Sequence, residues 1–115
     1  MFILILVGGE KLEFDPNLVS MLLEFDMPKG NLEGYNKTMA EVARMFVGWQ
    51  KDGIIKEYHS WSDNCGYILT FVLFDSIDKF AELWNHPKFH STFSSGTSVV
   101  INARWKLLRP AQAPE

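Results

Sequence analysis

The sequence predicts an α+β domain in which four antiparallel strands form one sheet and two helices cover one of its faces. The chain has 115 residues, which is one domain by length and enough to bury a core. Its 47% hydrophobic and 22% charged residues are typical of globular proteins. Between residues 18 and 108, two-residue and three-to-four-residue apolar periods alternate in the order β-α-β-β-α-β. This order is the ferredoxin-like arrangement.

Residues 1–17 precede this pattern. They open with the apolar run FILILV before Gly8 and Gly9, which is typical of a buried strand. The run is too short for a signal segment or a membrane span, so we expect a soluble, cytoplasmic protein without a membrane partner. Two interpretations of the segment stay open: an extra N-terminal strand that extends the sheet or clasps a partner, or a natural start at Met21.

The first strand of the pattern is expected at residues 18–27, where alternate side chains fall on opposite faces. A long helix follows, with Asn31 as its N-cap and Gly53 just after its end. Apolar residues recur along it at intervals of three and four, which indicates a buried stripe. The stripe consists of Leu32, Tyr35, Met39, Val42, Ala43, Phe46 and Trp49.

The second half of the pattern contains two strands, a broken helix and a last strand. Strands are expected at residues 54–61 and 67–75, and the second of these is apolar on nearly both sides, so it should lie centrally. Ser76 caps a second helix, which Pro87 stops or kinks. KFHSTF then forms one more helical turn, SSGTS is a loop, and the last strand covers residues 99–108.

These elements divide the chain into an N-terminal segment (1–17), one domain (18–108) and a flexible tail (109–115). With both helices on one face of the sheet, the other face needs a cover. Leu22, Val100 and one side of the central strand would expose an apolar patch there. We therefore expect the chain to be its own partner, as a homodimer that packs sheet on sheet.

Charge and composition narrow the ligand class. The net charge of −3 and the absence of a basic run argue against a nucleic-acid partner. Nine Phe and four Trp are typical of a large interface or an apolar pocket, so we expect a small apolar or aromatic ligand. The single Cys65 has no partner for an intrachain disulfide and no adjacent base that would make it a nucleophile.

Two stretches carry a resemblance to a known superfamily. EVARMFVGWQKDGIIKEYHSW and GYILTFVLFDSIDKFAELWNHPKF are similar to the helix–strand and strand–helix segments of muconolactone isomerases. Over residues 19–108 the chain resembles the dimeric α+β barrel superfamily, which also includes antibiotic-biosynthesis and haem-degrading monooxygenases. The resemblance implies a ligand cleft between sheet and helices and, for an enzyme, an isomerase or a cofactor-independent monooxygenase. Its substrate would be an aromatic, lactone or polyketide-like compound.

Three histidines and one carboxylate are the candidate catalytic residues. Glu57 and His59 lie two apart on one strand face, which suits an acid–base pair, although a half-exposed strand also carries such residues. His86 and His90 flank Pro87 and either face the cleft or end the helix in solvent. Because Pro87 disturbs their register and no acidic partner is adjacent, we expect no metal site.

The candidate substrate-binding residues are Trp84, Tyr58, Arg104 and Phe89. Trp84 is alternatively a core residue, and an inward Arg104 would anchor a carboxylate. Three functions remain open. The first is a small-molecule-binding protein or enzyme without a cofactor, and the second is a non-catalytic binding or stress-response module. The third is a haem-binding or haem-degrading protein with a histidine as axial ligand.

Overall fold

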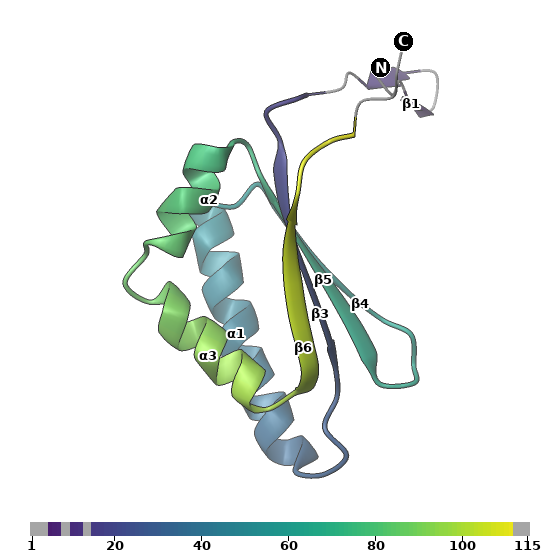
Figure 1. Cartoon of the computed structure of the whole chain (residues 1–115), viewed down its shortest axis with the longest axis vertical. Helices are drawn as coiled ribbons and strands as arrows, with labels where there is room; N and C mark the ends of the chain where they lie inside the picture. The colour runs from purple at the N-terminus through teal and green to yellow at the C-terminus, as the bar shows by residue number, and fades with distance from the viewer. Residues whose placement is uncertain (1–4, 8–9, 13–14, 112–115) are drawn as a thin grey trace.

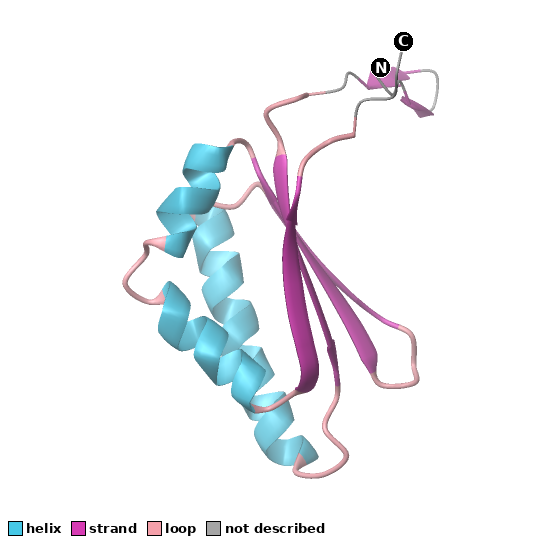
Figure 2. Cartoon of the chain, in the orientation of Figure 1, coloured by secondary structure: helices cyan, strands magenta, loops and turns pink. Residues whose placement is uncertain are grey.

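The computed structural model describes residues 5–7, 10–12 and 15–111. A sheet of four antiparallel strands has the order β4-β5-β3-β6, and three helices lie on one of its faces (Figures 1 and 2). The strands are β3 (Val19–Asp26), β4 (Glu57–Ser62), β5 (Tyr67–Phe74) and β6 (Ile101–Leu108). The predicted ferredoxin-like sheet is therefore confirmed, with β5 and β3 in its centre and β4 and β6 at its edges.

The helix α1 (Leu32–Lys51) has the predicted ends. The Asn31 side chain accepts a hydrogen bond from the Gly34 amide at 3.3 Å, and Gly53 follows with a φ of 82°. Such a positive φ is the conformation that glycine adopts at low cost. The predicted stripe is buried along most of its length. Its first residue, Leu32, is 50% exposed because the first turn of α1 extends beyond the sheet.

The second helix is broken at Pro87 as predicted, into α2 (Ile77–Trp84) and α3 (Phe89–Ser98). The prediction of a loop at SSGTS is wrong, since these residues form the second half of α3. The hydroxyls of Thr97 and Ser98 donate to carbonyls three residues earlier, at 3.2 and 2.7 Å. These bonds satisfy the polar side chains within the helix. Because α3 extends to Ser98, β6 begins at residue 101 and not at the predicted residue 99.

The start of β4 also differs from the prediction. Ile54 and Ile55 lie in the turn that follows α1, where both amides donate to the Trp49 carbonyl, at 3.0 and 3.3 Å. Both side chains are buried in the core between the sheet and the helices. That core includes Phe74 and Val72 of the central strand, which are fully buried, and each such side chain contributes about 1.5–3 kcal/mol.

The N-terminal segment does not extend the sheet. Its strands β1 (Ile5–Val7) and β2 (Glu10–Leu12) pair only with each other, in a register that joins Val7 to Glu10. The predicted extra strand of the main sheet is therefore wrong. In sequence terms, a Gly-Gly pair after an apolar run is a hairpin signal as well as the end of a strand. The first residues of FILILV, and residues 112–115 of the predicted flexible tail, lie outside the described residues.

None of the described residues covers the face of the sheet opposite the helices (Figure 2). Thr70, Val72 and Phe74 of β5 are buried toward the helices, so the alternate residues point the other way. The register places these residues beside Leu22 of β3. The outer apolar side chains are Leu22, Leu69, Phe71 and Leu73.

Candidate functional site

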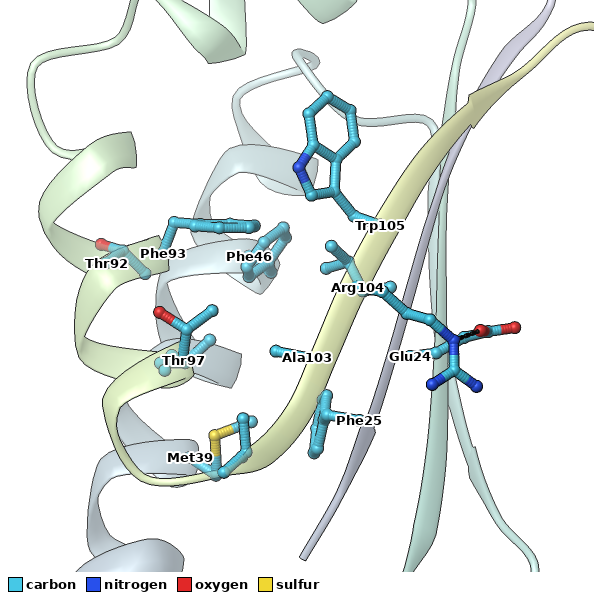
Figure 3. A pocket seen from close by; sticks show the side chains of 14 residues that line it. Glu24, Phe25, Met39, Phe46, Thr92, Phe93, Thr97, Ala103, Arg104 and Trp105 are labelled. Carbon is cyan, nitrogen blue, oxygen red and sulfur yellow. Dashed lines mark hydrogen bonds and ion pairs between the residues drawn. The ribbon is translucent and has the colours of Figure 1, made fainter.

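A cavity of about 120 Å³ lies between the sheet and the helices α1 and α3 (Figure 3). Protein interiors normally leave few voids larger than a water molecule, so a space of this size indicates a candidate ligand site. Strand β3 and the two helices supply most of its wall. Their main apolar side chains are Leu23, Phe25, Met39, Val42, Phe46 and Phe93.

The open side of the cavity is formed by β6 and by the end of α3. Ala103 and Gly96 contribute little or no side chain there, and Trp105 closes one end. The ladder between β3 and β6 is irregular at this point, with a register shift between Glu24 and Asp26. A bulge of this kind bends a strand and redirects its side chains.

Asn102 carries the bulge. Its φ is 56°, a left-handed conformation that asparagine tolerates better than most residues, and its Nδ2 donates to Asp26 Oδ2 at 2.9 Å. The strict alternation of faces is lost before this residue. Val100, which we expected on the outer face, therefore lines the cavity, and that prediction is wrong.

The wall of the cavity is apolar on its inner side. Its two titratable lining residues, Glu24 and Arg104, extend away from the space and bind each other beyond β6 (Figure 3). The hydroxyl of Thr97 donates to the Ser94 carbonyl at 3.2 Å, and that of Thr92 points away from β6. The geometry thus provides space for an apolar group and no acid or base directed at it.

The ion pair outside the cavity shapes the local electrostatics. The Arg104 hydrogen bond lowers the pKa of the Glu24 carboxyl below its usual value, and Tyr67 adds to this effect. Desolvation and the hydrogen bond to Glu24 raise the pKa of the Tyr67 phenol. Arg104 does not take the inward position that would let it anchor a carboxylate in the cavity, since its guanidinium is engaged by Glu24 on the outer face.

Trp84, Phe89 and His90 form an aromatic cluster next to the cavity. The Trp84 ring centroid lies 5.2 Å from that of Trp105, 5.4 Å from Phe89 and 5.2 Å from His90. Phe89 is fully buried, while His90 is exposed and meets Trp84 edge-on. Trp84 does not line the cavity itself, and it packs as a supporting residue behind the lining residue Trp105.

His86 lies at the break between α2 and α3. Its ring is 5.5 Å from Trp49, and its Nδ1 accepts a hydrogen bond from the Lys88 amide at 3.1 Å. This bond leaves Nε2 as the protonated nitrogen of the neutral ring. Neither His86 nor His90 lines the cavity.

The predicted pair of Glu57 and His59 is held together, but on the outer face of the sheet. His59 Nε2 lies 3.9 Å from Glu57 Oε2, both side chains are about half exposed, and the imidazole stacks on Trp61 at 5.5 Å. Tyr58, between them in sequence, points to the helices and stacks on Phe46 at 5.2 Å. Burial raises the pKa of the Tyr58 phenol above its usual value.

The sequence did not single out the cavity residues, because their apolar side chains have the same pattern as those of the hydrophobic core. A signal was nevertheless present: Gly96 and Ala103 are small residues opposite the aromatic stripe of α1. Across residues 5–7, 10–12 and 15–111, no cluster of three or more His, Cys, Asp or Glu side chains is placed to hold a metal ion. No helix in that part of the chain has the length and apolar character needed to cross a bilayer.

Comparison with solved structures places this fold among known proteins. The chain is similar to a variant of SnoaB, a cofactor-independent oxygenase from Streptomyces nogalater, with a TM-score of 0.66 and 16% identity over 86% of this chain and 99% of that one. A putative antibiotic biosynthesis monooxygenase from Caulobacter crescentus gives a TM-score of 0.65 and 10% identity over 84% and 92%.

A third similar structure is a dimeric protein of ferredoxin-like fold from Bacteroides fragilis. Its TM-score is 0.63, with 11% identity over 80% of this chain and 95% of that one. No protein-family model matches the sequence. No curated protein sequence matches it either. The resemblance to antibiotic-biosynthesis-type monooxygenases and dimeric α+β barrel proteins is thus confirmed for the fold, and identities this low carry no chemistry by themselves.

Proposed function

We propose that this protein binds a small apolar, aromatic compound in the cavity between the sheet and the helices α1 and α3. The observation that supports this most directly is the cavity itself, about 120 Å³ of space whose inner wall is hydrocarbon and aromatic. A fully enclosed apolar cavity of about this volume binds benzene, so an apolar space of this order suits an aromatic molecule. Each Å² of apolar ligand surface that leaves water contributes about 25 cal/mol.

The proposal includes a homodimer formed through the outer face of the sheet. In the register, Leu22 pairs with Phe71 at the centre of this face, and Trp61 of β4 is 54% exposed beside them. A contiguous apolar surface of this kind is costly in water. The solved protein from Bacteroides fragilis is described as dimeric, which supports a homodimer here without specifying its interface.

A second candidate function is cofactor-independent oxygenation of the bound compound. It is supported by the likeness to an oxygenase of this description and by the apolar wall of the cavity. The isomerase alternative requires an acid or base at the substrate, and Glu24 and Arg104 both point away. Haem binding has less support still, because His59, His86 and His90 all lie outside the lining.

The binding proposal is tested by thermal unfolding with a panel of one-, two- and three-ring aromatic compounds. A ligand that binds only the folded protein raises its stability with concentration. Ala103→Leu places a larger side chain in the cavity and should abolish this rise. Ala40→Leu makes the same change at an exposed position of α1 and should leave it intact. A protein that no panel member stabilises would refute the proposal.

Oxygenation is measured on the same protein with an oxygen electrode. Any compound found to bind is added aerobically, and its products are identified by mass spectrometry. Oxygen uptake that Ala103→Leu removes and Ala40→Leu retains would support the second function. Binding without oxygen uptake would leave a binding protein as the function.

A further inference from the structure

The open side of the cavity carries the indole ring of Trp105. Its neighbours there, Ala103 and Gly96, contribute a methyl group or no side chain to the wall. Trp105 belongs to β6, a strand at the edge of the sheet, and it is 41% exposed although it lines the cavity. A compound that enters along β6 therefore meets this indole.

The other polar side chains of the lining direct their donors elsewhere. The guanidinium of Arg104 is bound by Glu24 on the outer face of the sheet. The hydroxyl of Thr97 donates to a carbonyl of its own helix, and that of Thr92 points away from β6 (Figure 3). The indole N–H of Trp105 remains, and it forms no hydrogen bond within the part of the chain that the structure describes.

The indole is turned so that this N–H faces the cavity. In Figure 3 its five-membered ring, which holds the nitrogen, lies on the side of Phe46 and Phe93, and its six-membered ring points away from them. Trp84 supports the indole, with ring centroids 5.2 Å apart and planes tilted by 36°. Trp84 in turn packs on the buried Phe89, at 5.4 Å. A donor that is held in place before the ligand arrives lowers the cost of binding.

An N–H group at the edge of an apolar cavity selects for an acceptor on the ligand. In the free protein this exposed N–H can bond to water, and a ligand at the open side displaces that water. A hydrocarbon leaves the donor unpaired, which costs binding energy, whereas a carbonyl oxygen replaces the lost bond. Ligand sites commonly combine an apolar wall with a few placed polar groups in this way.

We propose that Trp105 is a specificity-determining residue of the cavity and that its indole N–H donates a hydrogen bond to an oxygen atom of the ligand. This inference rests on the proposed binding function and names its ligand class. The class is aromatic compounds with a carbonyl or another oxygen acceptor beside the ring, such as aryl ketones. The ring lies in the apolar space lined by Phe46 and Phe93, and the oxygen lies at the open side along β6.

The test compares acetophenone with α-methylstyrene, which has nearly the same shape but a CH₂ group in place of the carbonyl oxygen. Trp105→Phe keeps an aromatic ring and removes the donor. It should weaken acetophenone binding about fivefold in an NMR titration and leave α-methylstyrene binding nearly unchanged. Trp61→Phe, at a 54% exposed position of β4 outside the lining, should change neither affinity.

A second measurement uses the wild-type protein and needs no variant. The proton signal of the Trp105 Nε1–H should move downfield when acetophenone binds, because a hydrogen bond deshields the donated proton. Binding of α-methylstyrene should produce no such downfield movement, and this comparison separates the hydrogen bond from the ring current of the ligand.

The outcomes are distinct. Selective loss of acetophenone affinity in Trp105→Phe, together with the downfield movement, supports the inference. A substitution that affects both compounds equally, or an unmoved N–H signal in a protein that binds acetophenone, overturns it while the binding function stands. If neither compound binds, the inference fails, and the panel of one-, two- and three-ring compounds then decides the binding function separately.

Discussion

Phe71→Asp should separate the proposed homodimer into monomers. Phe71 occupies the centre of the outer sheet face, where the register places it between His59 of β4 and Leu22 of β3. Burying a phenylalanine contributes about 1.5–3 kcal/mol. In a two-fold interface each substitution occurs twice, so the loss is about 3–6 kcal/mol before the cost of burying the new carboxylate. The dissociation constant should therefore rise about 100-fold or more.

Sedimentation velocity at micromolar concentration measures this change. Val47→Asp is the matched control, since Val47 is 40% exposed on α1, a helix that covers the face of the sheet opposite the proposed interface (Figure 1). It should remain dimeric, and both variants should keep the helical circular dichroism of the wild type. A wild-type protein that sediments as a monomer, or a Phe71→Asp variant that remains as dimeric as the control, would refute the sheet-on-sheet assembly.

Three further predictions concern stability. Phe89→Ala empties a fully buried site and should lower the free energy of unfolding by about 3–5 kcal/mol in urea denaturation. Ser76→Ala removes the cap bond to the Lys79 amide and should cost about 1 kcal/mol in the same assay. The lowered pKa of Glu24 stabilises the fold above its unfolded value of 4.5, and this contribution is lost as pH falls through the lower folded pKa. Arg104→Gln should return the pKa of Glu24 toward 4.5 in a carboxyl NMR titration.

The architecture could be predicted from the sequence because each element carries a local signal. Asn31 and Ser76 as caps, Pro87 as the break and the apolar central strand all act within a few residues of themselves. The prediction of a loop at SSGTS was wrong because the local preference of these residues is overridden in the structure. Serine and threonine favour loops in isolation, and only the hydrogen bonds within α3, such as that of Ser98, keep them helical.

The candidate site was less predictable because it depends on space that no single residue encodes. The chemically conspicuous residues of the sequence are His59, His86 and His90, and the structure places all three outside the cavity. The bulge at Asn102 that turns Val100 inward depends on the pairing of two strands about 76 residues apart. A pattern of alternating faces has no means of showing such an irregularity.

The bulge has a consequence for the solubility of the chain. Strand β6 lies at the edge of the sheet, and a regular edge strand offers its free amides and carbonyls to any other extended chain. Asn102 interrupts that row, and Arg104 and Lys106 follow with charges. The same irregularity that borders the proposed ligand cavity therefore makes β6 a poor template for edge-to-edge aggregation.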